Sequence, residues 1–287
     1  MQAISKKGTI DSQGFKLGYI IEGEGMPALV IGSSVYYPRT FLGNIREHLK
    51  LIFIDHRGFV PPPRELAPED YQLNVLLADV DRIRKELELE NVLVIGHSGH
   101  AFLALEYAKK YTQHVSRVVM IGVSPNYSAA THQATAAFFQ TRATPERKQA
   151  FDKNMALLPA QIEAAPERRF VAFCVAAGPQ SWYDYQFDAT ALWRGVYTNM
   201  QIIDHVWGAI FRDIDITEGL ADFDKPVLLL LGKYDFLTGP PTLWDSVRGR
   251  FNDLTISVFE ESSHTPQYEE PDLFNQTLLR WLGVPTH

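Results

Sequence analysis

Short, uninterrupted apolar runs recur along the chain at lengths typical of strands. They occupy residues 28–31, 51–54, 92–95, 118–121 and 227–231. A strand that is covered on both faces loses the apolar–polar alternation of a half-buried strand, and parallel sheets bury both faces of their strands. The pattern therefore predicts a mostly parallel sheet.

A helix is predicted between the second and third apolar runs. Its apolar stripe consists of Leu76, Val80, Ile83 and Leu87, and charged residues lie off that stripe. Asn74 stands where a residue that caps the helix start is expected. Strand and helix in alternation are typical of a doubly wound α/β domain. Such domains bind ligands beyond the carboxyl ends of their strands, so candidate chemistry is expected there.

The alternation of strand and helix stops after residue 121 and resumes near residue 226. Between them no convincing buried strand occurs, only helix-like stretches such as 134–139 and 199–211. We predict an α/β core made of residues 1–125 and 221–287. Residues 126–220 are predicted to form an α-helical lid that is inserted into this core and covers one end of the sheet.

Composition and charge exclude several classes of partner. The 287 residues are 46% hydrophobic and 21% charged, which suits a folded chain with a large core. A net charge of -7 argues against nucleic acid or an anionic membrane surface as partner. No apolar run approaches the roughly 20 residues that cross a bilayer, and the first residues lack a secretory signal, so we expect a cytoplasmic protein.

The cysteine and histidine content predicts neither a disulfide nor a metal site. Cys174 is the single cysteine, and its apolar surroundings at 170–177 predict a small buried apolar side chain. The histidines show no metal-ligand spacing such as His-x-x-x-His, so we predict no metal and no cofactor. A small molecule is the expected partner, and both a monomer and a homodimer remain open.

The clearest candidate for chemistry follows the third apolar run. It is the sequence Gly96-His97-Ser98-Gly99-His100, placed between a predicted strand and an alanine-rich helix. On a sharp strand-to-helix turn the serine hydroxyl stands clear of the sheet, and small neighbours let the turn close. The helix start offers unpaired N–H groups to a developing oxyanion. A polar turn that merely caps a helix is the alternative, but the strand and helix context favours a nucleophile.

Two further polar residues follow later elements of the predicted core. Asp235 comes three residues after Gly232, which ends the apolar run 227–231. His264 lies in a loop just before the last predicted helix. A serine, an aspartate and a histidine at the carboxyl ends of strands can form a relay, in which the carboxylate orients the imidazole and the imidazole takes the serine proton.

These motifs resemble those of the α/β-hydrolase superfamily, specifically its lid-bearing branch of esterases, lactonases and proline-iminopeptidase-like enzymes. The resemblance implies an α/β-hydrolase fold, with a nucleophile at Ser98, an acid at Asp235 and a base at His264. It rests on the serine turn and on three further motifs, namely Pro226…Gly232…Asp235, His264-x-Pro266-x-x-Glu269-x-Pro271-x-x-Phe274 and Asp55-His-Arg57-Gly58.

The sequence departs from the family pattern at two positions. No histidine precedes Gly32, although the family usually has His-Gly after its third strand. The resemblance still implies that the backbone N–H of Ser33, with Ser34 as the alternative, and the N–H of Gly99 bind the oxyanion. His100 stands where the family usually has glycine. We expect it to be a buried structural histidine with backbone partners rather than a residue that lines the pocket.

We therefore predict a cofactor-free serine hydrolase that cleaves a small, largely apolar ester or lactone through an acyl-enzyme on Ser98. One alternative is an aminopeptidase similar to proline iminopeptidase. That reaction needs a carboxylate from the insertion for the substrate ammonium group, and Asp184 and Asp204 are the candidates. The other alternative is a hydrolase-like fold that binds a ligand without turnover, which the two departures allow.

Overall fold

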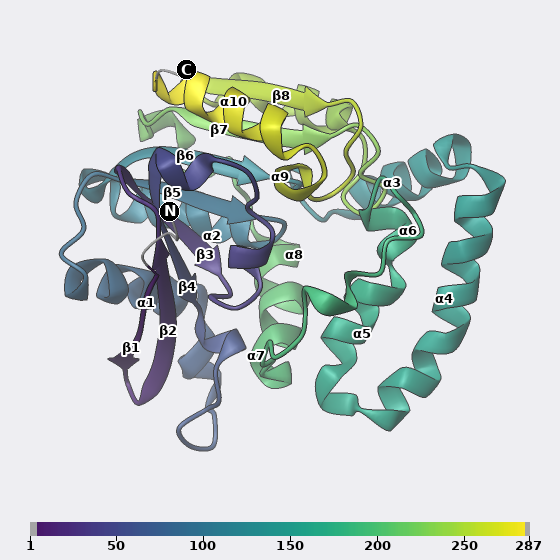
Figure 1. The fold of residues 1–287 in the computed structure, drawn as a ribbon, viewed down its shortest axis with the longest axis horizontal. Coiled ribbons are helices and arrows are strands. Elements are labelled where there is room, and N and C mark those ends of the chain that lie inside the picture. Colours follow the sequence, from purple (N-terminus) through teal and green to yellow (C-terminus); the bar gives the residue numbers. More distant parts are fainter. Residues whose placement is uncertain (1–4, 285–287) are drawn as a thin grey trace.

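A single sheet organises the computed structural model, which describes residues 5–284. Eight strands in this part of the chain follow the order β1-β2-β4-β3-β5-β6-β7-β8 (Figure 1). β1 and β2 form an antiparallel hairpin, β2 is also antiparallel to β4, and the remaining neighbours from β4 to β8 are parallel. The strands are β1 (Lys6–Ser12), β2 (Phe15–Glu22), β3 (Met26–Gly32), β4 (Leu49–Asp55), β5 (Val92–His97), β6 (Val115–Ile121), β7 (Val227–Gly232) and β8 (Leu254–Phe259). The predicted mostly parallel sheet is confirmed.

The apolar runs predict the inner strands but miss the edge strand β8. All five runs lie within β3, β4, β5, β6 and β7, where almost every residue is buried. In β8 apolar and polar residues alternate, and Val258 is 41% exposed. An edge strand has one half-solvated face, so no uninterrupted apolar run marks it.

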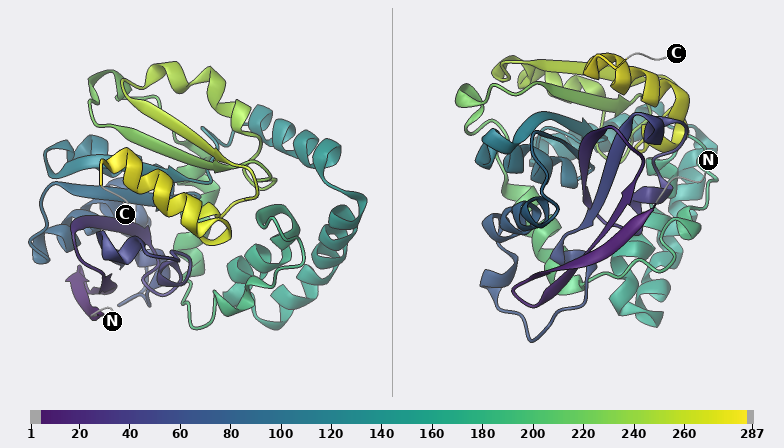
Figure 2. Two further views of the ribbon diagram at one scale, coloured as in Figure 1. Left: turned by 45° about the horizontal axis from the view of Figure 1, so that its top comes forward. Right: turned by 60° about the vertical axis from the view of Figure 1, so that its left-hand side comes forward.

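Helices cover both faces of the sheet (Figure 2). Leu29 and Ile31 of β3 belong to a core cluster that includes α1 (Leu73–Glu86) and α2 (His100–Lys110). Ala28 and Val30 belong to a second cluster that includes α10 (Pro271–Leu282). Successive side chains of a strand point to opposite faces, so both faces of the sheet bury apolar residues. Within residues 5–284, no helix is both long and apolar enough to cross a membrane.

The start of α1 differs slightly from the prediction. Gln72 precedes the helix in extended conformation, and Asn74 lies within the first turn instead of capping it. A buried ion pair then fastens this helix to the loop after β4, since Arg57 Nε lies 2.6 Å from Asp79 Oδ2. This contact fixes the loop that carries His56.

Between β6 and β7 the described chain forms helices and no strand. They are α3 (Ala129–Arg142), α4 (Pro145–Ala164), α5 (Arg169–Ala176), α6 (Gly178–Ser181), α7 (Met200–His205) and α8 (Phe211–Asp213). α3 to α6 lie beyond the carboxyl ends of the parallel strands (Figure 1). α7 continues through a π-helical turn, 206–210, into α8, and Phe211 joins the core cluster beside α2. These helices therefore face the end of the sheet where ligands bind in α/β folds.

Candidate active site

Ser98 lies at the tip of a tight turn between β5 and α2. Its φ of 58° is in the left-handed region, which is uncommon for residues other than glycine. The Ser98 N–H donates to the carbonyl oxygen of Ile121 at 2.8 Å and ties the turn to β6. Gly96 lets the chain turn closely, because a Cβ at this position would collide with the carbonyl group of His100. The turn leaves Ser98 partly exposed at the carboxyl end of the sheet.

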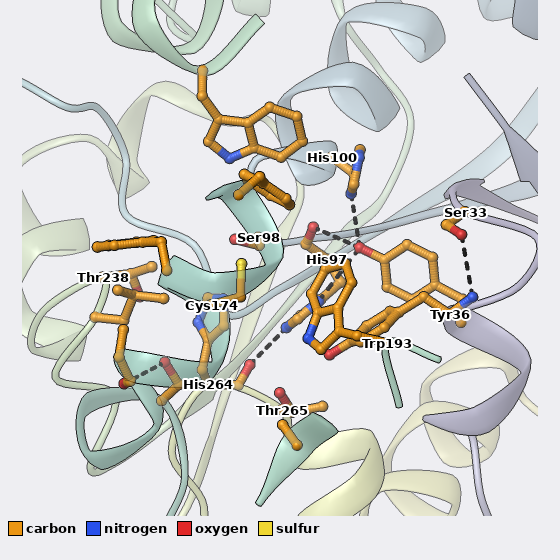
Figure 3. A pocket seen from close by; sticks show the side chains of 18 of the residues that line it. Ser33, Tyr36, His97, Ser98, His100, Cys174, Trp193, Thr238, His264 and Thr265 are labelled. Atoms are coloured by element: carbon orange, nitrogen blue, oxygen red, sulfur yellow. Dashed lines mark hydrogen bonds between the residues drawn. The ribbon is translucent and has the colours of Figure 1, made fainter. Parts of the chain in front are cut away.

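Ser98 borders a cavity of about 420 Å³. The volume is within the range of small-molecule sites. The wall comes both from loops at the end of the sheet and from the helices between β6 and β7, and Figure 3 shows Ser98, His100 and His264 around this space. Its aromatic residues, apart from the histidines, are Tyr36, Tyr37, Phe59, Tyr127, Phe170, Phe173, Trp182, Trp193 and Trp207. Such a wall favours an apolar ligand.

His264 and Asp235 form a buried pair next to Ser98. His264 Nδ1 lies 2.8 Å from Asp235 Oδ2, and Asp235 also accepts hydrogen bonds from Leu237 N–H and from the N–H and hydroxyl of Thr238. Burial alone raises the pKa of Asp235, but His264 and the hydrogen bonds outweigh it and hold this pKa below its ordinary value. An ionised Asp235 requires a proton on Nδ1, which leaves Nε2 of His264 as an acceptor.

The structure brings Ser98 and His264 to one cavity, with Asp235 behind the histidine. Within residues 5–284 no hydrogen bond joins the Ser98 hydroxyl to the His264 ring. In structures without substrate such contacts are often long and shorten when substrate binds. The arrangement therefore suits proton transfer between serine and histidine during a reaction.

Glu269 holds the backbone on both sides of His264. Its Oε2 accepts the N–H groups of Ser263 and Thr265, each at 3.0 Å, and its Oε1 accepts the N–H of Tyr183. Burial raises the pKa of Glu269 to about 7, against the opposing effect of these hydrogen bonds. This one carboxyl group thus links the loop that carries His264 to the chain segment after α6.

The loop after β3 decides which serine can offer an N–H group to an oxyanion. The Ser34 N–H donates to Asp55 Oδ1 at 2.6 Å, and the Ser34 hydroxyl donates to Oδ2 at 2.9 Å. Ser33 lines the cavity, and its N–H finds no acceptor in the part of the chain that the structure describes. The same holds for the N–H of Gly99 at the start of α2. The Ser34 N–H is thus already used by Asp55, whereas the N–H groups of Ser33 and Gly99 have no acceptor among residues 5–284.

A family model described as "alpha/beta hydrolase fold" matches residues 23–271. The chain belongs to the α/β-hydrolase fold family. It is 46% identical over 279 residues to the AB hydrolase superfamily protein YclE of Bacillus subtilis (strain 168), which covers 97% of this chain and 99% of that protein.

Solved structures agree on the fold. An alpha/beta fold family hydrolase from Bacillus anthracis str. Sterne matches with a TM-score of 0.73 and 21% identity, over 96% of this chain and 99% of that one. A proline iminopeptidase of Mycobacterium smegmatis matches with a TM-score of 0.71 and 18% identity, over 97% and 98%. At these identities the two structures support the α/β-hydrolase fold and not a shared substrate.

His100 of this α/β-hydrolase differs from the expectation in two respects. It is buried as expected, but it lines the cavity, and its two ring nitrogens contact the side chains of Tyr37 and His56. Nδ1 lies 2.7 Å from the Tyr37 hydroxyl and Nε2 lies 3.1 Å from His56 Nε2. The two partners are 63 and 44 positions away from His100 in the sequence. No sequence spacing connects them.

Cys174 lies in a different place from the one predicted. It is half-buried and lines the cavity from α5, together with Phe170 and Phe173. Burial raises the pKa of the thiol to about 12, so the group stays neutral. The apolar stretch 170–177 indicates an apolar environment correctly, but it does not distinguish a core from the wall of an apolar cavity.

The two candidate carboxylates for a substrate ammonium group lie outside the cavity. Asp184 is exposed and accepts the N–H of Gln186, and Asp204 is exposed and pairs with Arg169. Among the described residues that line the cavity there is no Asp or Glu. Nor do residues 5–284 contain a group of three or more His, Cys, Asp and Glu side chains placed to hold a metal ion.

Proposed function

We propose that this α/β-hydrolase cleaves a small, largely apolar carboxylic ester or lactone through an acyl-enzyme on Ser98. The observation that carries the proposal is the shared cavity, which Ser98 and His264 both border while Asp235 holds His264 from behind. These are the groups that acyl transfer needs, namely a nucleophile, a base and a carboxylate that orients the base.

The reaction would proceed in two steps. Ser98 Oγ attacks the substrate carbonyl while His264 Nε2 takes the hydroxyl proton, and the N–H groups of Ser33 and Gly99 bind the oxyanion. His264 then returns the proton to the leaving alkoxide: from an ester the alcohol departs, whereas from a lactone it stays joined to the acyl group as a hydroxyl. In the second step His264 takes a proton from water, the hydroxide attacks the acyl group, and the carboxylic acid leaves as Ser98 recovers its proton.

The cavity wall supports an apolar acyl or alcohol group. The helices between β6 and β7 supply Phe170, Phe173, Trp182 and Trp207 to this wall, so they exclude water from the reacting carbonyl. We propose on this basis that residues 126–220 act as the lid of the site. Arg212 also borders the cavity, but its charge is paired with Asp213.

An aminopeptidase activity has less support. A relative in fold is a proline iminopeptidase by name, yet the cavity of this chain offers no carboxylate among its described lining residues to pair with a substrate ammonium group. Burying an unpaired ammonium group in an aromatic cavity is unfavourable. Amino-acid anilides are therefore expected to be poorer substrates than uncharged esters of similar size.

The test combines covalent labelling with turnover. A fluorophosphonate probe is expected to add once to the wild-type chain and not to Ser98→Ala, as measured by intact mass. Ser98→Ala should lower turnover of p-nitrophenyl esters on the order of 10³-fold or more, because one hydroxyl carries the covalent step. Ser246→Ala, which removes an exposed hydroxyl, is the matched control and should be labelled normally.

Three results would contradict the proposal. An unlabelled wild type without turnover of esters, lactones or anilides favours a ligand-binding role. Turnover of anilides well above esters favours an aminopeptidase. Labelling at a residue other than Ser98 places the nucleophile elsewhere.

A further inference from the structure

The two proposed oxyanion donors lie on separate segments of the chain. Ser33 follows β3, whereas Gly99 starts α2. Both N–H groups must reach one oxygen atom, so the relative position of the two segments decides how well the oxyanion is bound. The Tyr37 hydroxyl connects these segments, because it lies 2.7 Å from His100 Nδ1 and donates to the carbonyl oxygen of His97 at 3.3 Å.

The protons in this connection can be assigned from the hydrogen bonds. The Gly58 N–H donates to His56 Nδ1 at 3.0 Å, so a neutral His56 carries its proton on Nε2. His56 Nε2 then donates to His100 Nε2, and His100 carries its own proton on Nδ1, facing Tyr37. Burial lowers the pKa of His56 to about 3 and that of His100 well below its ordinary value, so both rings are neutral. The Tyr37 hydroxyl therefore donates its own proton to the carbonyl oxygen of His97.

The rings of Tyr37 and His100 pack against Gly32, the residue before Ser33. Gly32 has a φ of 143°, and a Cβ there would collide with the Tyr37 ring and lie 2.9 Å from the His100 ring. Tyr37 N–H also donates to the carbonyl oxygen of Ser33 at 3.2 Å. Movement of either ring would therefore displace the Ser33 peptide and its N–H group.

We propose that Tyr37 and His100 form a strut that positions the N–H groups of Ser33 and Gly99 for the oxyanion, while His56 fixes which nitrogen of His100 carries the proton. The inference rests on the proposed function. It gives a role to His100, which stands where the family usually has glycine. Tyr37, His56 and His100 are positioning residues, because they act through the two N–H groups and not on the substrate.

Tyr37→Phe tests the strut directly. It removes the hydroxyl that joins the two segments while keeping the ring against Gly32. Loss of oxyanion binding should lower kcat for a p-nitrophenyl ester by about 10- to 100-fold with KM within about twofold, since small displacements at reacting groups have effects of this size. Affinity for an alkyl boronic acid, which forms a tetrahedral adduct on serine, should fall in parallel.

A pair of variants at His100 tests the same idea if Tyr37→Phe does not fold. His100→Asn keeps an N–H near the position of Nδ1, whereas His100→Leu removes it. We expect His100→Asn to retain severalfold more kcat than His100→Leu. If His100 had only a structural role, the kcat values of the two variants would follow their thermal stabilities and not the presence of the donor.

The matched control is Tyr107→Phe. Its hydroxyl is also buried and donates to Asp81 at 3.3 Å, but it lies in the core beside α1. This variant should lower the melting temperature and leave kcat per folded molecule unchanged. Unchanged kcat and boronic acid affinity in Tyr37→Phe, or equal kcat in the two His100 variants, would overturn the strut. Ser98 labelling of the wild type separates this outcome from failure of the proposed function.

Discussion

The two sides of the cavity are held by different chemistry. On the neutral side, at the ends of β3 and β5, the uncharged rings of Tyr37 and His100 support the residues that surround Ser98. On the acidic side, at the ends of β7 and β8, the carboxyl groups of Asp235 and Glu269 hold His264.

This difference separates the response of the two sides to pH. On the neutral side, burial lowers the pKa values of His56 and His97 to about 3 and that of His100 well below its ordinary value, and it raises the pKa of Tyr37, so none of these rings changes charge in the physiological range. The Glu269 carboxyl group, with its pKa raised to about 7, does change charge there. Protonation of Glu269 is therefore expected to alter the support of the base, while the hydrogen bonds among the His56, His97 and His100 rings and Tyr37 keep their protons; on the neutral side only Asp55, whose pKa is raised to about 6, changes charge near this range.

The largest expected effect is the loss of the base on the acidic side. His264→Ala removes the group that accepts the Ser98 proton, so kcat for esters should fall on the order of 10³-fold or more, measured on folded protein. His114→Ala is the control, because this histidine pairs with Glu90 at the surface. If His264→Ala retained turnover, the base would have to be another residue, and His97 and His100 on the neutral side would be the candidates.

Gly32→Ala is expected to give the next largest effect, on the neutral side. The added Cβ meets the rings of Tyr37 and His100, and the φ of 143° is a conformation that almost only glycine adopts. We expect a loss of about 2 kcal/mol or more in the free energy of unfolding, together with lower kcat. Gly195 also has a positive φ, but a Cβ there would have no neighbour within 4 Å. Gly195→Ala therefore measures the cost of the backbone conformation alone. The difference in free energy of unfolding between the two variants then measures the cost of the collision with Tyr37 and His100.

Glu269→Gln tests whether the acidic side requires a carboxylate. Three N–H groups point at the two oxygens, so the amide NH₂ of glutamine must face a donor. The raised pKa means that folded wild type holds an extra proton between about pH 4.5 and pH 7, so its free energy of unfolding falls as pH rises through this window. Glutamine does not titrate.

Glu269→Gln is expected to have a lower free energy of unfolding than wild type. This difference should shrink by about 2 kcal/mol between pH 5 and pH 8, because only wild type loses stability over this range. Urea denaturation at the two pH values measures it. Glu163→Gln, at an exposed position of α4, serves as the control, and its difference from wild type should not depend on pH. A deficit of Glu269→Gln that stays constant or grows with pH contradicts the assignment.

The smallest effect is expected for the same change at Asp55, a carboxyl group on the neutral side. Asp55 accepts from the Ser34 N–H and hydroxyl and from the Gly18 N–H, and an amide can still accept from the Ser34 N–H and donate to its hydroxyl. Burial raises the pKa of Asp55 to about 6, so loss of the charge costs little. Asp55→Asn should change the free energy of unfolding by about 1 kcal/mol or less at pH 7. If Asp55→Asn lost more free energy of unfolding than Glu269→Gln, the neutral side and not the acidic side would depend more on its carboxylate.

The residues of the acidic side are easier to predict from the sequence than those of the neutral side. Asp235 and His264 each follow a strand within a motif, and the buried strands themselves are visible as apolar runs. Tyr37, His56 and His100 come from three separate segments, after β3, after β4 and at the start of α2, and the proton on each ring depends on contacts that form only in the folded chain. A family pattern with glycine at position 100 gives no reason to look for a hydrogen bond there.

The helices between β6 and β7 show the same limit. In α4 only Arg147 and Leu158 are buried, so apolar periodicity gives little information on how this helix packs. Cys174 of α5 and Trp207 of the 206–210 turn both line the cavity, and the rings of Phe170 and Trp207 bring these two elements into contact. The sequence predicts helices here, and the three-dimensional contacts decide which faces line the cavity.

The left-handed backbone of Ser98 has a consequence for how such a site evolves. A residue with a Cβ at this φ is disfavoured by roughly 1–2 kcal/mol, and glycine avoids most of this strain. Ser98→Gly would thus remove the nucleophile and make the fold more tolerant of other mutations, whereas Ser98→Ala would keep the strain. Thermodynamic stability by itself favours glycine at position 98, so a serine in this strained position fits the proposed role of Ser98 as nucleophile.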